Sequence, residues 1–265
     1  MTANVLGQVP AGAAVGTLAR REASRIIRHP VYAVLLLYFV VLVGVQATTS
    51  LWPPSRDSVR DLLVTLGLLW LGPATFFAAN LIASSARRAH AESQLAATPT
   101  AAQARTLAIC LGVLLPATLA TGFAVMLWLV EHNGSTLEYA QGPAELAVIP
   151  LCTLGGGLLG IATDRWLPWR GSPAIVGFAV LAWVVAMMDR GDLQWTAPWT
   201  MSSGYYHDAQ LAAGSPLWHA VYLLGLALLA AVAALLRHAS YRRPLLALGT
   251  VLLVGTLAAC WAQMR

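Results

Sequence analysis

Lysine is absent from this chain of 265 residues, because all 16 of its basic residues are arginines. A P-loop needs a lysine to bind the β- and γ-phosphates of a nucleotide, so the chain cannot carry one. Retinal and pyridoxal cofactors bond to a lysine amine, so Schiff-base chemistry with them is excluded as well. The chain therefore cannot hydrolyse ATP through a Walker-type site of its own.

Charged residues of both signs are scarce. They make up 10% of the chain, against roughly 25% in soluble domains, while hydrophobic residues make up 58% and the mean hydropathy is +0.68. This composition is typical of a protein whose main solvent is a lipid bilayer. The net charge of +5 would suit nucleic acid, but the arginines form no single basic stripe, so we expect no nucleic-acid partner.

Signals for disulfides, metal sites and cleavable leaders are also missing. Cys110, Cys152 and Cys260 lie in apolar runs without C-x-x-C spacing, and no two of the six histidines are spaced i,i+4. The first 19 residues hold no basic residue, so they lack the charged region of a cleavable signal. We therefore expect no metal site, no disulfide and no cofactor in this chain.

Long charge-free apolar stretches dominate what is present. Their lengths match the roughly 17–25 residues that a membrane-spanning helix requires. The sequence therefore predicts an all-α, polytopic membrane helix bundle over residues 31–264, with six to seven transmembrane helices. The predicted spans lie near 31–52, 62–86, 106–130, 146–163, 172–188, 214–236 and 244–262. The fourth and fifth spans could instead form one re-entrant pair.

The arginines predict the orientation of the bundle. One set of alternating connecting segments holds 12 arginines, from Arg20 to Arg243, and the other set holds four, which are Arg56, Arg60, Arg190 and Arg265. Because basic residues accumulate on the cytoplasmic side, the first set is expected inside. The N-terminus is then expected to be cytoplasmic and the C-terminus external.

An amphipathic segment precedes the first span. After a flexible cytoplasmic stretch at 1–14, residues 15–29 sort into an apolar arc and a basic arc at helical spacing. This pattern predicts an interfacial helix that lies on the cytoplasmic leaflet and ends before Pro30. The basic arc consists of Arg20, Arg21, Arg25 and Arg28.

Two connecting segments have a distinctive composition. The cytoplasmic loop 87–105 is rich in Ala, Gln and Glu up to Ala97, which favours a short helix that Thr98 and Pro99 would end. The external loop 189–213 carries four aromatic residues, which favour packing at the outer membrane interface. They are Trp195, Trp199, Tyr205 and Tyr206.

Polar and small residues within the spans have two interpretations each. Thr75, Asn80, Thr118 and Thr121 could line a substrate path, or they could form hydrogen bonds that pack the helices. Gly156 and Gly160 form a G-x-x-x-G pair, which lets another helix approach closely. That helix could belong to the same chain or to a partner.

Several segments together resemble the membrane subunit, or permease, of ABC exporters of the type-2 class. They are REASRIIRHP before the first span, the span pair that follows, RRAHAESQLAATPTAAQARTLA between spans two and three, and PLWHAVYLLGLALL at span six. In that class the first segment is the elbow helix. The segment between spans two and three is a coupling loop, which docks on the ATPase through a Glu-x-x-Leu-x-x-x-Pro-like pattern. The extra apolar stretch at 244–264 departs from the usual six spans.

The resemblance implies a location in the cytoplasmic membrane of a bacterium, a partner and a set of contact residues. A separate cytoplasmic ABC ATPase would bind ATP and Mg²⁺, and a second permease copy or a paralogue would complete the transporter. The implied contact residues are Glu92, Gln94, Leu95, Thr98 and Pro99. Membrane lipids are further partners, because the flanking arginines could meet anionic headgroups.

The low content of charge within the spans favours a lipophilic or amphipathic substrate for such an exporter. A different class of function remains open. The chain could be a membrane protein that does not transport, either an assembly or sensory subunit or an intramembrane enzyme. Such an enzyme would use external groups, namely Glu131, Glu145, Asp189 and His207.

Overall fold

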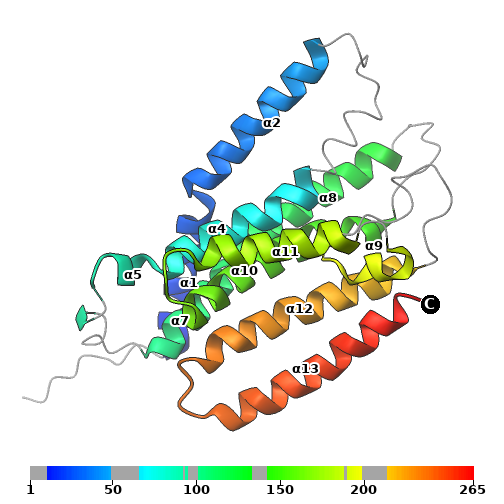
Figure 1. Ribbon diagram of the computed structural model, residues 1–265. Helices are drawn as coiled ribbons and strands as arrows, with labels where there is room; N and C mark the ends of the chain where they lie inside the picture. Colours follow the sequence, from blue (N-terminus) through cyan, green and yellow to red (C-terminus); the bar gives the residue numbers. More distant parts are fainter. Residues whose placement is uncertain are drawn as a thin grey trace, which may run out of the picture.

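The structure is a computed structural model that describes residues 11–48, 66–91, 93–94, 101–132, 142–187, 190–198 and 214–265. Every regular element in these ranges is helical, which confirms the predicted all-α class (Figure 1). The elements are α1 (Ala11–Ile27), α2 (Pro30–Thr48), η1 (Leu66–Leu71), α4 (Gly72–Ala83), α5 (Ser85–Arg88), α7 (Ala102–Gly112), α8 (Leu114–His132), α9 (Pro143–Leu146), α10 (Val148–Trp166), α11 (Ser172–Met187), η2 (Gly191–Thr196), α12 (Pro216–Leu236) and α13 (Arg242–Ala262).

Four helical stretches in the described residues are long and apolar enough to cross a membrane, which indicates a membrane protein. They are Ala102–Leu129, Pro143–Trp166, Pro216–Leu236 and Arg242–Ala262. Two further apolar helices, α4 and α11, are shorter. These stretches cover the third, fourth, sixth and seventh predicted spans, while the total of six to seven stays a prediction.

The central helix of the bundle is α10, which packs against α4, α8 and α12 (Figure 1). Two glycines on α10 let α4 approach it closely. A methyl group built on Gly156 would collide with the carbonyl oxygen of Gly72, and one on Gly160 would collide with that of Phe76. The helix that fills this notch therefore belongs to the same chain.

The third predicted span is one long apolar stretch with a break in its helical geometry. α7 ends at Gly112 and α8 begins at Leu114, so the break falls at Val113. Pro116 lies three residues further along. Proline has no N–H and its ring crowds the preceding turn, which accounts for the local distortion.

The N-terminal helix α1 lies crosswise at one end of the bundle and packs mainly on α7 (Figure 1). Gly112 permits this contact, because a methyl group there would lie 3.0 Å from the backbone nitrogen of Ala23. Ile26 is fully buried in the contact. The four arginines of the basic arc, Arg20, Arg21, Arg25 and Arg28, are exposed.

The predicted bounds of this helix were wrong at both ends. It begins at Ala11 and not at residue 15, so residues 11–14 are helical and do not belong to a flexible segment. It ends at Ile27 and not at residue 29. His29 and Pro30 then turn the chain into α2, and the His29 Nδ1 atom accepts a hydrogen bond from the Val31 N–H at 3.3 Å. The placement of α1 on the membrane surface stays a prediction.

Helix α2 leans away from the bundle (Figure 1). The Tyr32 and Thr75 hydroxyls are hydrogen-bonded at 2.8 Å, and the rings of Tyr38 and Trp70 lie 4.7 Å apart. Its other apolar side chains remain largely exposed, with Val34 at 67%. The exposed surface of α2 is therefore suited to lipid.

At the opposite end of the bundle, a buried polar network joins η2 to α12 and α13. The Gln263 Nε2 atom donates to the Trp195 carbonyl at 2.8 Å, and the Gln263 Oε1 atom lies 3.0 Å from His219 Nδ1. Trp195 is only 3% exposed, so it packs against the protein itself. The placement of its segment at the outer membrane interface stays a prediction. Trp199, Tyr205 and Tyr206 lie outside the described residues.

Candidate functional site at the basic end of the bundle

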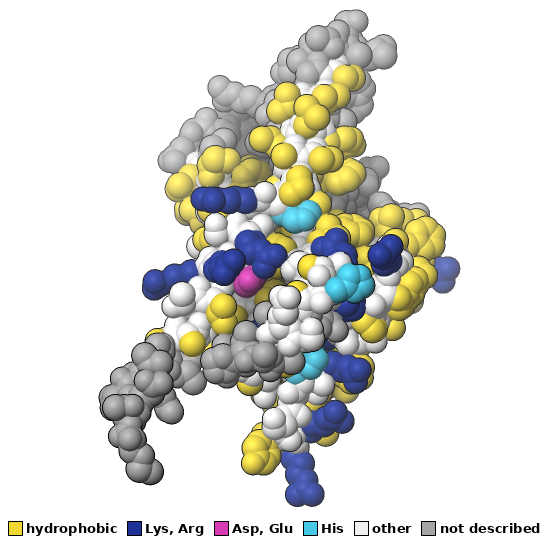
Figure 2. Space-filling view, turned by 90° about the vertical axis from the view of Figure 1, so that its left-hand side faces the viewer, with side chains coloured by type: hydrophobic (Ala, Val, Ile, Leu, Met, Phe, Trp, Pro, Cys, Tyr) yellow, Lys and Arg dark blue, Asp and Glu magenta, His cyan; other side chains and the backbone are white. Residues whose placement is uncertain are grey.

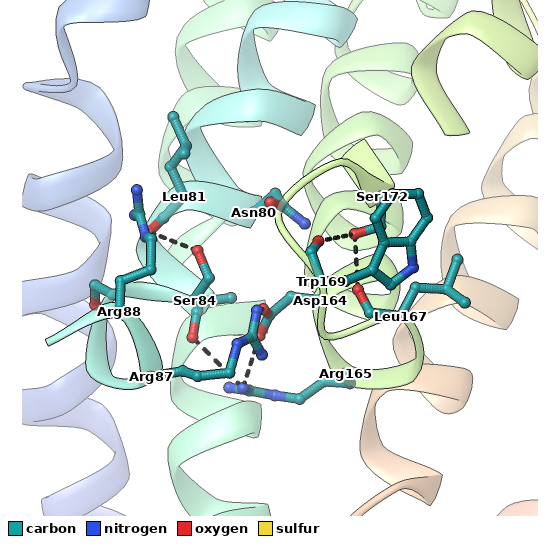
Figure 3. A network of polar contacts seen from close by, with 12 residues as sticks. Asn80, Leu81, Ser84, Arg87, Arg88, Asp164, Arg165, Leu167, Trp169 and Ser172 are labelled. Carbon is teal, nitrogen blue, oxygen red and sulfur yellow. Dashed lines mark hydrogen bonds and ion pairs between the residues drawn. The ribbon is translucent and has the colours of Figure 1, made fainter. Parts of the chain in front are cut away.

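A buried carboxylate lies between two arginines at the cytoplasmic end predicted from the arginine bias. The Asp164 Oδ1 atom accepts a hydrogen bond from Arg87 Nη2 at 2.5 Å, and Oδ2 accepts one from Arg165 Nη1 at 3.0 Å (Figure 3). The Asp164 side chain is 0% exposed, while that of Arg87 is 32% exposed. Burial of a carboxylate is tolerated here because both of its oxygens are paired with cations.

The last turn of α10 places this cluster. The sequence predicts that the fourth span ends at residue 163, but α10 continues to Trp166 and so carries Asp164 and Arg165 on helical backbone. The Trp166 Nε1–H donates to the Ala233 carbonyl at 2.8 Å, which ties this turn to α12. The turn to α11 is closed by the Ser172 hydroxyl, which donates to the carbonyls of Leu167 and Trp169 (Figure 3).

Arg87 belongs to a different part of the chain from Asp164. It lies in α5, the short helix that follows α4 and begins the predicted coupling loop. The Arg87–Asp164 ion pair therefore joins the start of loop 87–105 directly to the central helix α10. Arg165 adds a contact to the same region, because its Nη1 atom lies 3.5 Å from the Ala83 carbonyl oxygen at the end of α4.

Positive charge exceeds negative charge across this end of the bundle, and Figure 2 shows arginines gathered over it with little acidic surface between them. The pKa values of two histidines at this end are lowered, first by burial and then by neighbouring arginines. Burial lowers the pKa of His29, and the Arg88 guanidinium lowers it further. Burial also lowers the pKa of His238, with Arg165 as the next contributor. The end is therefore a region of positive potential.

The implied ATPase contacts fall mostly outside the structural description. Glu92, Leu95, Thr98 and Pro99 lie outside the described residues, and Gln94 is described and exposed. The ends of the predicted loop 87–105 are helical, because Arg87 and Arg88 belong to α5 and residues 102–105 belong to α7. The docking role of the stretch between them stays a prediction.

The four residues of the suggested substrate path lie on two different surfaces. Thr75 and Asn80 are buried, and Asn80 Nδ2 donates to the Gly160 carbonyl at 2.9 Å, which joins α4 to α10. Thr118 and Thr121 are on the exposed side of α8, where each hydroxyl donates to a carbonyl four residues earlier in its own helix. Only Thr75 and Asn80 therefore form hydrogen bonds that join two helices, with Thr75 bonded to Tyr32 of α2.

Of the four external groups considered for an enzyme, only Glu145 has a described side chain. Glu145 Oε2 accepts a hydrogen bond from the Gly142 N–H at 2.9 Å and so stabilises the start of α9. Asp189 and His207 lie outside the described residues, as does the side chain of Glu131. Among the described residues, no group of three or more His, Cys, Asp or Glu side chains could hold a metal ion.

Sequence reasoning treated Asp164 and Arg165 as loop residues and did not identify their cluster. The rule that a charged residue ends a span takes no account of ion pairs, which let the helix itself continue with its charges buried. One signal could have identified it. Among the connecting segments predicted to be cytoplasmic, Asp164 is one of three acidic residues, and it directly follows a span.

No family model, no curated protein and no solved structure matches this chain.

Proposed function

We propose that this chain is the membrane-spanning permease subunit of an ATP-driven exporter of the ABC type-2 class. It would work with a separate cytoplasmic ATPase and a second permease, either another copy or a paralogue. The resemblance of the segments around α1, α5 and α12 to that class is the starting point. The four long apolar helices and the basic end of the bundle support it.

The energy source follows from the composition. A chain without lysine has no P-loop, so ATP-driven work requires another subunit to bind ATP and Mg²⁺. The surface offered to that subunit would be the basic end of the bundle. The two ends of loop 87–105 belong to α5 and α7 at this end of the bundle, and its sequence carries the Glu92 to Pro99 stretch.

The observation that carries the proposal is the ion pair between Arg87 and Asp164. It would transmit a displacement of the coupling loop to α10, because Arg87 begins the loop and Asp164 is held in the last turn of that helix. α10 in turn packs on α4, α8 and α12. Tightly packed helices move as units and do not deform gradually, so pulling on this contact would shift the central part of the bundle.

The substrate class follows from the surroundings of the spans. The surfaces of α2, α11 and α13 are apolar and exposed, as shown by Phe178 at 72% and Val251 at 70%. An ionic substrate would find few fixed charges to offset its desolvation along such surfaces. The cargo would therefore be lipophilic or amphipathic and would enter from the inner leaflet.

The test uses the full-length chain purified together with a candidate P-loop ATPase from the same genome. The double variant Glu92→Ala/Leu95→Ala should lose both complex assembly and stimulation of ATP hydrolysis. Gln103→Ala, which changes a half-buried residue at the start of α7, is the matched control and should retain both. If assembly and stimulation are unchanged in the double variant, the docking assignment is wrong.

A second variant tests transmission separately from docking. Arg87→Gln should still assemble with the ATPase, because the docking stretch is intact, but substrate export per ATP hydrolysed should fall. Export is measured in proteoliposomes as release of a fluorescent amphiphile. A complex that exports normally with Arg87→Gln would show that this ion pair has no role in coupling.

A further inference from the structure

A pocket with a volume of about 390 Å³ opens between α1 and the end of α4, at the side of the basic end. Its walls come from the last turns of α1, the start of α2, the last turn of α4 and α5. The lining residues are Ser24, Arg25, Arg28, His29, Pro30, Leu81, Ile82, Ser85 and Arg88. The pocket is separate from the Asp164 cluster, because none of the three residues of that cluster lines it.

Three of the lining residues are arginines, and none of the lining residues is acidic. Arg25 is paired with Glu22 at 2.8 Å. Arg28 and Arg88 are exposed, and neither has an ion pair within the described part of the chain. Among the described residues, two guanidinium charges therefore line the pocket without a carboxylate paired to them.

Two of the arginines are held in place by neighbouring groups. Arg25 Nη2 donates to the Ser85 hydroxyl at 3.2 Å, which joins α1 to α5, and Arg88 donates to the Leu81 carbonyl. Such contacts restrict the side chains before any ligand arrives, which lowers the entropy lost on binding. The hydroxyl of Ser24 is a further donor on the pocket wall.

The pocket also has an apolar side. Pro30, Leu81 and Ile82 line it, and Pro30 begins α2, whose exposed apolar residues Val34 and Leu37 follow within two turns. Figure 2 shows the apolar side chains of α2 beginning next to the basic surface. A ligand with an anionic head and an apolar tail would match both surfaces at once.

We infer that this pocket binds a phosphate oxyanion, supplied by the headgroup of an anionic phospholipid whose acyl chain lies along α2. Arginine guanidiniums bind phosphate through paired N–H donors, which suits the two unbalanced arginines. Basic pockets at the inner side of membrane helices are known to recognise anionic headgroups. The inference stands on this pocket alone and holds whether or not the chain exports a substrate.

The test compares lipid retention by the full-length chain in detergent, measured by native mass spectrometry. The probes are dioleoyl phosphatidylglycerol, which is anionic, and dioleoyl phosphatidylcholine, in which a choline balances the phosphate. The wild-type chain should retain the anionic lipid preferentially. The double variant Arg28→Gln/Arg88→Gln should lose affinity for it by about tenfold or more, while phosphatidylcholine retention should not change.

The matched control is Arg242→Gln/Arg243→Gln, which removes the same charge from two exposed arginines at the start of α13. It should retain the anionic lipid as the wild type does. Equal loss in both double variants, or no loss in Arg28→Gln/Arg88→Gln, would overturn the assignment. Arg28→Lys/Arg88→Lys keeps the charge without the paired donors and should give an intermediate affinity, which guards against a loss caused by misfolding.

A competition experiment identifies the source of the phosphate. Inorganic phosphate is added to the lipid-loaded chain, with sodium chloride of equal ionic strength as the control for screening. If phosphate releases the lipid and sodium chloride does not, the pocket recognises the oxyanion itself. Retention under both salts, together with loss in Arg28→Gln/Arg88→Gln, shows that headgroup and acyl chain are bound together. If both salts release the anionic lipid equally, and the wild type and Arg28→Gln/Arg88→Gln behave alike, the lipid is not bound at a specific site.

Discussion

At the scale of single residues, Asp164 is notable because its charged side chain is fully buried. Its carboxylate is 0% exposed and is paired with Arg87 and Arg165. Buried ion pairs give little net stability compared with apolar residues, but removal of one partner leaves the other charges buried without compensation. The cluster is therefore sensitive to loss of its single negative charge.

Replacement Asp164→Asn should destabilise the protein markedly. The two arginines would then face each other without a counter-ion, and losses of about 3–5 kcal/mol are typical when a buried pair is broken. Thermal unfolding of the purified chain in detergent measures the effect. Asp192→Asn, at an exposed position in η2, is the control and should change stability by about 0.5 kcal/mol or less. Similar melting curves for both variants would contradict this account of Asp164.

The second prediction concerns His29 and the dependence of stability on pH. Its folded-state pKa lies below the ordinary value of 6.5, because burial and Arg88 disfavour the imidazolium. On acidification the unfolded chain is therefore protonated first, so the stability gained from neutral His29 is complete above pH 6.5 and is lost as the pH falls below it. Protonation also removes the Nδ1 acceptor of the Val31 N–H.

The melting temperature should accordingly fall between about pH 7.5 and pH 5.5, a range that brackets the ordinary histidine pKa. His29→Asn should reduce this dependence, because asparagine can accept the Val31 N–H and does not titrate. His238 also has a lowered pKa and contributes in the same direction, so some dependence should remain. An unchanged pH profile in His29→Asn would show that His29 is not responsible.

At the scale of elements, the contact between α4 and α10 determines how closely the central helices pack. Gly156 and Gly160 bring α10 against the backbone carbonyls of Gly72 and Phe76. Asn80 adds a hydrogen bond to the Gly160 carbonyl at 2.9 Å. Small residues at such positions permit van der Waals contact between backbones, which is a main source of helix association in lipid.

Gly160→Ala should destabilise the bundle by about 1–3 kcal/mol, because its methyl group would displace the backbone of α4. Gly122→Ala is a matched control on α8, where a methyl group meets nothing within 4 Å. That control should be neutral or slightly stabilising, since alanine favours helix more than glycine does. Both melting temperatures are measured in the same detergent. A neutral Gly160→Ala variant would contradict the close packing of α4 on α10.

Much of the helical arrangement was predictable from the sequence, and the reasons for success and failure are physical. Charge-free length located α12 and α13 to within two residues, because a helix in lipid must bury or pair every charge. The same rule did not predict that α10 continues to Trp166, since it takes no account of ion pairs formed with distant residues such as Arg87. The buried Trp195 was missed for a similar reason, because its position depends on Gln263, which is far away in the sequence.

At the scale of the whole molecule, the two ends of the bundle differ in chemistry. The end with α5 carries most of the described arginines, the ion pairs of Asp164, and the pocket lined by Arg28 and Arg88. The opposite end carries η2 and the C-terminal residue Arg265, whose guanidinium lies 3.4 Å from the centroid of the Trp261 ring (Figure 1). The arginine bias of the sequence predicts that the first end is cytoplasmic.

Reporter fusions test this topology in a bacterial host. Alkaline phosphatase fused after Arg265 should be active, because it folds only outside the cytoplasm, while green fluorescent protein at the same site should be dark. Fusions after Ser240, in the turn between α12 and α13, should give the reverse pattern. An active phosphatase after Ser240 would reverse the predicted orientation, and cytoplasmic signals at both sites would mean that α13 does not cross the membrane.

The packing of α1 on α7 has a consequence for biosynthesis. α1 packs mainly on α7, which is synthesised only after residues 28–101. At roughly 5–20 residues per second, the ribosome needs about 4–15 s to make that segment. During this interval the apolar arc of α1 must be covered by something else, and the nearest apolar phase is the bilayer surface. The membrane surface would thus cover the apolar arc of the nascent helix until α7 has been synthesised and takes its place.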